Sequence, residues 1–284
     1  MNLVSISKLC RDAQRNGYAV PAFNIFNHLT LQAVIEACTE ARSPVIIQTS
    51  VTTVKFHGIT RLEKLVRSEA EQTEIPVCLH LDHCTDPELA KACVDGGWSS
   101  VMVDGSHHPF EKNISMTAEI TQYAHQHGVE TEGELGAISG TEEHIQVSEA
   151  DACMADVEQS REFVRRTGID IFAPAVGTAH GMYKGDPNID YDRFVNIREV
   201  CGQIPLVVHG GTGLSIEAFQ KFVTLGAAKI NISTAIKHSY MNALTDFLNH
   251  NANTAPLSLD QYVLDQVKSV VRKHIDIFGS SNRV

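Results

Sequence analysis

Several features are scarce or missing in this sequence. No apolar run approaches the roughly 20 residues that are needed to cross a bilayer, and residues 1–5 lack the charged and apolar regions of a secretory signal. Basic residues are in deficit, because 23 Lys and Arg stand against 34 Asp and Glu, for a formal net charge of -11. This acidic balance argues against a nucleic-acid partner and against binding to an anionic membrane.

The seven cysteines form no CxxC motif, as expected for reduced thiols, and we expect a cytoplasmic protein.

The chain does contain a regular alternation of short apolar runs and amphipathic stretches. Apolar runs of this length predict buried strands, and Asp86-Pro87 and Gly168 are typical helix start and stop signals. Eight such alternations predict an α/β protein with a (β/α)8 TIM barrel, forming a single domain over residues 1–284. A doubly wound sheet is the alternative, and residues 259–278 predict an additional C-terminal helix. The predicted strands are 19–24, 45–49, 77–81, 99–103, 129–134, 169–176, 205–208 and 229–232, and the predicted helices between them are 29–41, 62–72, 87–95, 110–126, 157–167, 191–201 and 216–225.

Polar residues follow nearly every predicted strand. The carboxyl ends of barrel strands share one face, which carries the chemistry in such folds, so these side chains are expected to meet there. They are Asn24, Ser50, Asp82, His83, Asp104, Glu132, Glu134, His180, His209 and Asn231.

Three of these residues, His83, His180 and His209, predict a metal site. Neutral imidazole suits Zn²⁺, and three protein ligands leave a coordination position open for a substrate. Each histidine alone is more often structural, but three at matching strand ends favour a metal. His80 is expected to alternate away from His83 by the pleat of the strand. The other histidines on loops or helix faces are expected to be solvated: His28, His57, His125, His127, His144, His238, His250 and His274.

Two carboxylates next to this set, Asp104 and Glu134, have two interpretations. They could orient the metal ligands or offer a second position for the ion, or they could form an ordinary hydrogen-bond network at the barrel mouth. Glu132 shares the period-two direction of Glu134, so both are expected to point into the barrel.

Glycine turns after the later strands predict a phosphate site. Gly210, Gly211 and Thr212 follow one strand and lead into a helix, and Gly181 and Lys184 offer another turn with a cation. Backbone N–H groups and a helix N-terminus bind anions well, which allows an acidic protein to hold a phosphate. Asn231, Ser233 and Thr234 open a further helix after the last strand.

The sequence resembles the class II, zinc-dependent ketose-bisphosphate aldolases, and most closely those acting on tagatose-1,6-bisphosphate or fructose-1,6-bisphosphate. The resemblance runs from Tyr18 to Arg283. It is carried by Leu79-His-Leu-Asp-His83, Ser100-Val-Met-Val-Asp-Gly-Ser-His107, Glu134-Leu-Gly136, Gly177-Thr-Ala-His-Gly181 and Lys229-Ile-Asn231.

The resemblance implies reversible aldol cleavage to dihydroxyacetone phosphate and an aldehyde such as glyceraldehyde 3-phosphate. It implies Zn²⁺ on the three histidines, Asp82 as the catalytic acid/base and Glu142 as a second proton carrier. It further implies Asp104 and Glu134 as alternative metal ligands, a monovalent cation (Na⁺ or K⁺) near the phosphate, and a homodimer or homotetramer. The substrate-binding candidates are Asn24, Ser50, Gly181, Lys184, Gly210, Gly211, Thr212, Asn231, Ser233 and Thr234.

The sequence departs from the family pattern at two positions. Ser233 occupies a position where fructose-bisphosphate enzymes usually carry Asp and tagatose-bisphosphate enzymes usually carry Ala, which leaves the C4 configuration of the substrate open. Gly133 replaces a usual Ala, a change of small volume. Two alternatives remain open. One is an aldolase or epimerase acting on another sugar phosphate or sugar-acid derivative, because metal-stabilised enediolates serve both reaction types. The other is a non-catalytic subunit that stabilises a partner aldolase, which would be expected to lack the three histidines.

Overall fold

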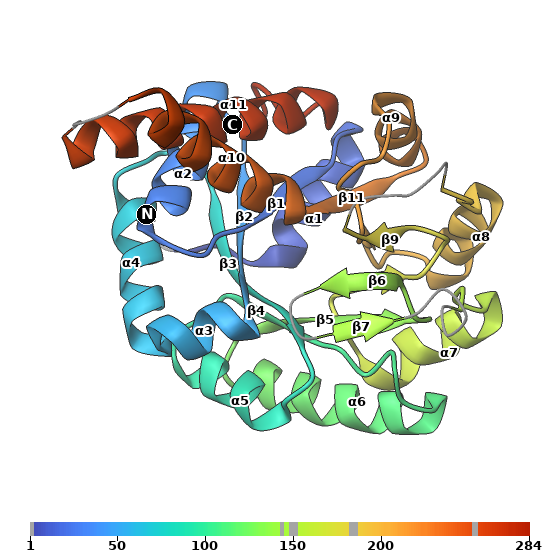
Figure 1. Cartoon of the computed structure of the whole chain (residues 1–284). Helices are drawn as coiled ribbons and strands as arrows, with labels where there is room; N and C mark the ends of the chain where they lie inside the picture. The colour runs from blue at the N-terminus through green and yellow to red at the C-terminus, as the bar shows by residue number, and fades with distance from the viewer. Residues whose placement is uncertain (1–2, 143–144, 148–152, 182–186, 252–254) are drawn as a thin grey trace.

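Eight parallel strands close into a barrel in the order β1-β11-β10-β8-β5-β4-β3-β2 (Figure 1). The computed structural model describes residues 3–142, 145–147, 153–181, 187–251 and 255–284. The predicted TIM barrel is confirmed, and every predicted strand is present within a few residues. The strands are β1 (Val20–Asn24), β2 (Val45–Ser50), β3 (Val77–Cys84), β4 (Ser100–Val103), β5 (Glu130–Leu135), β8 (Ile171–Pro174), β10 (Leu206–Val208) and β11 (Ala227–Ile232).

The helices form a ring around the strands (Figure 1). Their apolar faces and the outward faces of the strands make one large core, which includes Trp98, Phe163, Phe194 and Phe222. This burial of apolar surface is the main stabilising contribution to such a fold. All the predicted helices are present: α2 (His28–Ala41), α4 (Ile59–Glu71), α5 (Pro87–Asp95), α6 (Phe110–Gln126), α7 (Val157–Thr167), α8 (Tyr191–Cys201), α9 (Ile216–Thr224) and α11 (Pro256–Ile277).

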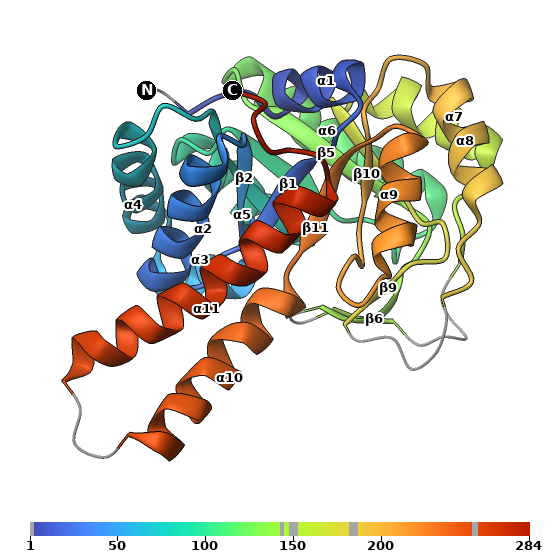
Figure 2. The same ribbon diagram turned by 90° about the horizontal axis from the view of Figure 1, so that it is seen from above.

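A helix that the sequence analysis did not predict, α1 (Ile6–Asn16), closes the amino-terminal end of the barrel (Figure 2). Its buried residues Ile6, Leu9 and Cys10 pack against interior strand residues in a second core cluster. The local signals were available, because Ser5 caps the helix by accepting from the Lys8 N–H and Gly17 ends it with φ 67°. Because α1 covers the amino-terminal end of the barrel, the mouth of the barrel lies at the carboxyl ends of the strands.

The last two helices, α10 (Thr234–His250) and α11, form a hairpin arm that projects from the barrel (Figure 2). The Lys268 ammonium lies 2.8 Å from Glu36 and 2.7 Å from Glu40, both on α2, and so ties α11 to the barrel wall. None of the helices in the described ranges is both long enough and apolar enough to span a membrane.

His274 on α11 corrects one expectation. It was predicted to be solvated, but its ring is buried against the edges of Phe23, Phe219 and Phe278, because α11 packs across the barrel wall at this point. His144 lies outside the described residues, and the remaining six predicted surface histidines are exposed or half-buried.

Two further elements at the mouth were not predicted. Helix α3 (Val51–His57) follows β2 directly, and a small sheet with the order β7-β6-β9 lies beside the barrel. The sheet consists of β6 (Ser139–Glu142), β7 (Ile145–Val147) and β9 (Ala179–His180). Its β6–β9 pairing needs Gly140, which has φ 110° and whose missing Cβ would lie 2.2 Å from the His180 carbonyl oxygen.

Candidate active site at the mouth of the barrel

A bulge at the end of β3 places Asp82 and His83 on the same side of their strand. Consecutive residues of a regular strand point to opposite faces, but the β3–β4 register shifts between Leu81 and Cys84, and His83 has φ 46°. A non-glycine residue in this left-handed region is unusual and strained, and such residues cluster at functional sites. Both side chains therefore enter the barrel mouth, where each is at most 4% exposed.

The three predicted metal ligands come together. One nitrogen from each of His83, His180 and His209 lies within 4.8 Å of the others. The His83 ring meets His180 at a centroid distance of 4.9 Å and His209 at 4.6 Å, both edge to face. His180 arrives from β9 of the small sheet rather than from the end of barrel strand β8, which stops at Pro174. The expected extension of that strand to residue 176 is therefore too long, and the chain turns back over the mouth instead.

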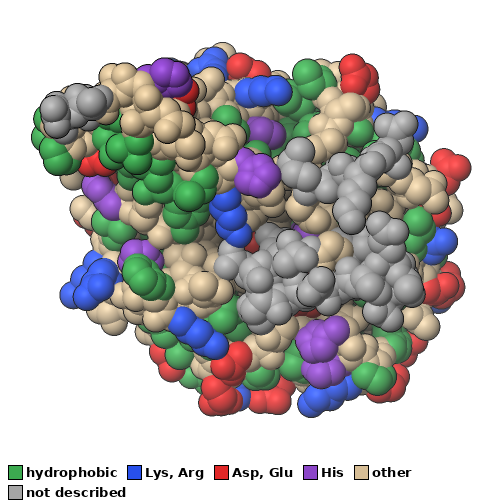
Figure 3. Space-filling model, in the orientation of Figure 1, with side chains coloured by type: hydrophobic (Ala, Val, Ile, Leu, Met, Phe, Trp, Pro, Cys, Tyr) green, Lys and Arg blue, Asp and Glu red, His purple; other side chains and the backbone are tan. Residues whose placement is uncertain are grey.

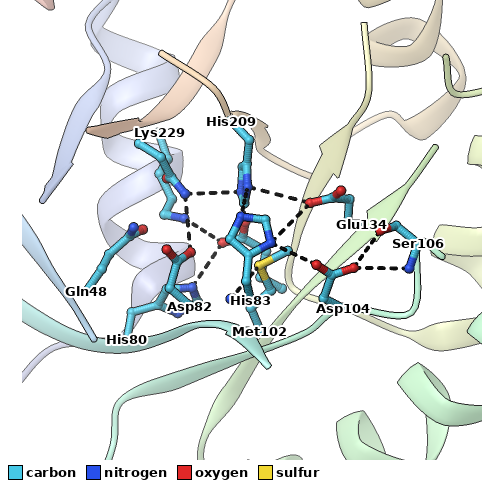
Figure 4. Close-up of polar contacts among 12 residues, drawn as sticks. Gln48, His80, Asp82, His83, Met102, Asp104, Ser106, Glu134, His209 and Lys229 are labelled. Atoms are coloured by element: carbon cyan, nitrogen blue, oxygen red, sulfur yellow. Dashed lines mark hydrogen bonds and ion pairs between the residues drawn. The ribbon is translucent and has the colours of Figure 1, made fainter. Parts of the chain in front are cut away.

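Hydrogen bonds on the far sides of two rings direct their lone pairs toward a common point. His83 Nδ1 lies 2.8 Å from Asp104 Oδ2, and His209 Nε2 lies 2.7 Å from Glu132 Oε1. Because a carboxylate only accepts, each of these nitrogens carries the hydrogen, which leaves a lone pair on the opposite nitrogen. Those opposite nitrogens, His83 Nε2 and His209 Nδ1, are 2.8 Å apart (Figure 4). Two facing lone pairs repel unless a cation lies between them, so these residues fit a metal ion.

The burial of His209 also supports a metal ion at this site. Removal from water lowers the pKa of His209, which keeps the ring neutral, as a ligand must be. The arrangement of carboxylate, imidazole and open nitrogen is the usual support of a zinc-bound histidine.

Asp104 and Glu134 form a second group with His83, whose possible ligand atoms also lie within 4.8 Å of one another. Asp104 Oδ1 accepts from the Ser106 N–H at 3.1 Å and from its hydroxyl at 2.6 Å. Burial alone would raise the pKa of Asp104, but the hydrogen bonds from His83 and Ser106 hold it well below its ordinary value. Glu134 Oε2 lies 3.8 Å from His83 Nδ1 and 3.6 Å from His209 Nδ1. The geometry therefore allows both interpretations of these carboxylates, as ligand supports and as a second ion position.

Asp82 is held by two amides from the neighbouring strands. Asn24 Nδ2 donates to Asp82 Oδ2 at 2.8 Å, and Asn231 Nδ2 donates to Oδ1 at 3.3 Å. Gln48 in turn donates to Asn24 Oδ1 at 2.9 Å. Both oxygens of Asp82 therefore accept a hydrogen bond from a neighbouring amide, which fixes the orientation of the carboxylate at the mouth. Gln48 was missed by the sequence analysis, although it lies two residues before Ser50 on the same strand.

The predicted phosphate turns also meet. Gly210 has φ 69°, and its missing Cβ would lie 2.5 Å from the Ala179 carbonyl oxygen, so this turn runs against β9. Thr212 Oγ1 accepts from the Ala235 N–H at 3.3 Å, which joins the turn to the N-terminus of α10. A small pocket results, lined by His180, Gly181, Gly210, Gly211, Thr212, Asn231, Ser233 and Thr234.

Three predicted residues stand apart from this arrangement. The Ser50 hydroxyl caps α3 by accepting from the Thr53 N–H at 3.2 Å, which gives it a structural task at the mouth. Glu142 is the last residue of β6, but its side chain lies outside the described part of the chain. The whole of Lys184 also lies outside it.

Beneath the mouth lies a charged layer that the sequence analysis did not assign. Lys229 and Glu132 are fully buried, with Nζ 2.8 Å from Oε2. Burial alone would raise the pKa of Glu132, but the Lys229 charge and the hydrogen bond from His209 hold it well below its ordinary value. The expectation for Glu132 is correct, because it points inward. The expectation for His80 is wrong: it also points into the barrel, 3.4 Å from Glu132, because the bulge brings His83 round to the side of His80 and Asp82.

Comparisons with known proteins agree with the site. The family model "Fructose-bisphosphate aldolase class-II" matches residues 4–283. A Coccidioides immitis structure assigned as a fructose-1,6-bisphosphate aldolase is 32% identical, with a TM-score of 0.91, covering 98% of this chain and 97% of that one. The YdjI aldolase of Escherichia coli K12 is also 32% identical, with a TM-score of 0.88 and 99% of both chains covered.

A third structure extends the likeness of the fold. The fructose-bisphosphate aldolase of Campylobacter jejuni is 22% identical, with a TM-score of 0.84, over 100% of this chain and 97% of that one. Together with the family match over nearly the whole length, these relatives settle the membership. The chain belongs to the class-II fructose-bisphosphate aldolase family and is an aldolase, a lyase.

Proposed function

We propose that the chain catalyses zinc-dependent, reversible aldol cleavage of a phosphorylated ketose, tagatose-1,6-bisphosphate or fructose-1,6-bisphosphate, to dihydroxyacetone phosphate and glyceraldehyde 3-phosphate. The observation that carries this proposal is the convergence of His83, His180 and His209 beside the doubly supported carboxylate of Asp82. A basic carboxylate next to a cation site is what removal of a hydroxyl proton requires.

The pocket between the glycine turns is the proposed phosphate site. The Gly210–Thr212 turn and Thr234 at the N-terminus of α10 line it, and glycine turns and helix N-termini attract anions. The Ser233 hydroxyl makes no capping bond to α10 and lines the pocket. A monovalent cation, Na⁺ or K⁺, belongs to this proposal as a further counter-charge for the phosphate, and Lys184 is its proposed side-chain cation.

Asp82 is the proposed proton acceptor. With the phosphate in the pocket beside Asn231, the ketose chain runs toward Asp82, which takes the C4 hydroxyl proton as the C3–C4 bond breaks. Zn²⁺ held by the three histidines would polarise the ketose carbonyl as a Lewis acid. Glu142 is the proposed donor of the proton that C3 then needs, and its strand β6 pairs with the strand of His180.

Substrate choice is the point at which the proposal can be tested most sharply. Cleavage rates for fructose- and tagatose-1,6-bisphosphate are measured side by side, with and without added Zn²⁺. The proposal expects metal-dependent release of dihydroxyacetone phosphate from at least one of them. Release from neither, under conditions in which a different sugar phosphate or a sugar-acid phosphate is cleaved, would favour the alternative substrate class, which metal-stabilised enediolate chemistry also serves.

We also propose a homodimer or homotetramer. The projecting arm exposes three large apolar side chains, with Met241 58%, Leu248 62% and Leu257 78% exposed, and apolar side chains are visible over this part of the molecule (Figure 3). Exposed apolar surface of this kind marks interfaces. Sedimentation equilibrium is expected to give a multiple of the 31.1 kDa chain mass, and a monomer at micromolar concentration would contradict the assembly.

A further inference from the structure

We propose that Glu132 and Lys229 are positioning residues for the metal site: together they select the His209 tautomer that leaves Nδ1 free to bind the ion. This inference rests on the proposed zinc dependence. It concerns residues below the site that hold no ion themselves and face neither the substrate pocket nor the mouth.

The pair spans the barrel interior. Lys229 lies on β11 and Glu132 on β5, and two strands, β10 and β8, separate them in the barrel order. Each side chain is one level below a residue of the mouth on its own strand, since Lys229 precedes Asn231 by two positions and Glu132 precedes Glu134 by two. Figure 4 draws Lys229 and His209 in this interior cluster.

The Glu132 carboxylate divides its two oxygens between two tasks. Oε2 accepts from Lys229 Nζ at 2.8 Å, and Oε1 accepts from His209 Nε2 at 2.7 Å. Lys229 and Glu132 are 0% exposed and His209 is 2% exposed, so these contacts are shielded from bulk water. The ammonium thus fixes the carboxylate, and the carboxylate fixes the hydrogen on Nε2.

A competing contact shows why this selection is needed. Asn231 Nδ2 lies 3.3 Å from the same His209 Nε2. Without an acceptor at Glu132, that amide would donate to Nε2, and the ring hydrogen would move to Nδ1, the nitrogen that faces His83. The tautomer with hydrogen on Nδ1 cannot bind a metal there.

A buried ion pair by itself is weak evidence for a role in stability, because well-packed apolar residues in its place are often neutral or stabilising. This property separates a positioning role from a merely structural one. The double variant Glu132→Met/Lys229→Met removes both charges and leaves neither partner unpaired, so it is expected to fold. The variant Glu132→Gln/Lys229→Met keeps a carbonyl acceptor for His209 Nε2 and serves as the conservative rescue.

The test measures the Zn²⁺ dissociation constant by chelator competition and the visible spectrum of the Co²⁺-loaded protein, with thermal unfolding of the metal-free protein alongside. We expect the Met/Met variant to unfold near the wild-type temperature but to bind Zn²⁺ about 10- to 100-fold more weakly, with an altered Co²⁺ spectrum. The Gln/Met variant is expected to recover most of the affinity. Glu130→Gln is the matched control, because Glu130 lies on the same strand but bonds Ser5 and Ser7 of the closing helix, and it is expected to leave Zn²⁺ affinity unchanged.

Two results would count against the inference in distinguishable ways. A folded Met/Met variant with wild-type Zn²⁺ affinity and Co²⁺ spectrum would overturn the positioning role alone. A wild-type protein that binds no Zn²⁺ would overturn the proposed function and this inference with it.

Discussion

The Nδ1 atom of His83 lies 2.8 Å from Oδ2 of Asp104, and this contact places the ring hydrogen on Nδ1 while Nε2 faces His209. It also joins the ends of β3 and β4 across the bulge at which their register shifts. The carboxylate is in turn held by Ser106. The orientation of the His83 ring therefore depends on residues at the ends of both β3 and β4.

Asp104→Asn tests this contact. The amide keeps the shape of the side chain but loses the charge, so its hold on the Nδ1 hydrogen of His83 weakens. We expect Zn²⁺ affinity to fall by about 10- to 100-fold, measured by chelator competition, while the folded secondary structure is retained by circular dichroism. Unchanged affinity would mean that Asp104 serves only the hydrogen-bond network of the mouth.

Asp82→Ala separates proton transfer from metal binding. Asp82 contacts Asn24 and Asn231 and is not among the residues grouped as ligands. We expect full Zn²⁺ content by elemental analysis and a loss of turnover of about 10²- to 10⁴-fold, which is typical for removal of a general base. Wild-type turnover in the metal-loaded variant would remove Asp82 from the mechanism.

Gly210→Ala tests the phosphate turn, and Gly17→Ala is its matched control. The two glycines have nearly equal φ, 69° and 67°, so both variants incur a backbone strain of about 1–2 kcal/mol. A Cβ at Gly17 meets no atom within 4 Å, whereas at Gly210 it lies 2.5 Å from the Ala179 carbonyl oxygen.

Only Gly210→Ala is therefore expected to disturb substrate binding. We predict that its KM for the phosphorylated ketose rises by about tenfold, equivalent to about 1.4 kcal/mol, while Gly17→Ala lowers the unfolding temperature and leaves KM unchanged. Equal KM values in the two variants would indicate that phosphate binds elsewhere.

Thiol labelling tests the packing of the cysteines. Among the seven cysteines only Cys153 is exposed, and burial raises the pKa of Cys84 to about 11 and of Cys93 and Cys201 to about 12. Because the thiolate is the reactive form, we expect one fast-reacting thiol per native chain at pH 8 and seven after denaturation, measured with a chromogenic disulfide. Several fast thiols in the native protein would contradict the closed barrel wall.

Much of the fold could be predicted because the barrel strands and their helices have recognisable local sequence patterns. Strands such as Val45–Ser50, which begins with the apolar run Val45–Ile47, are buried on both faces, and caps such as Asp86-Pro87 mark helix starts. Helix α1 was missed despite its Ser5 cap, because its short amphipathic pattern lies outside the strand–helix alternation. The small sheet was missed because strands as short as β9, with two residues, depend on tertiary pairing and show no periodicity.

The meeting of His83, His180 and His209 was predicted from the sequence, but the orientation of these side chains was not. Ser50 caps α3 instead of joining them, and the side chain of Glu142 and the whole of Lys184 lie outside the described residues. His83 enters the mouth through a bulge whose existence depends on pairing with β4, which no local pattern of β3 reveals. The role of Lys229 was missed, although it belongs to the motif Lys229-Ile-Asn231, since its partner Glu132 is 97 positions away in the sequence. Contacts across a barrel interior arise from closure, and closure is not a local property.

Zinc stoichiometry is the most direct test of whether His83, His180 and His209 hold a catalytic metal ion. The protein is stripped with a chelator and titrated with Zn²⁺ while bound metal and cleavage activity are followed, for the wild type and for His83→Ala, His180→Ala and His209→Ala. We expect an inactive stripped protein, full activity at one tightly bound Zn²⁺ per chain, and loss of that tight binding in each variant. Cleavage that persists after complete stripping, or three variants that bind Zn²⁺ as tightly as the wild type, would contradict this expectation.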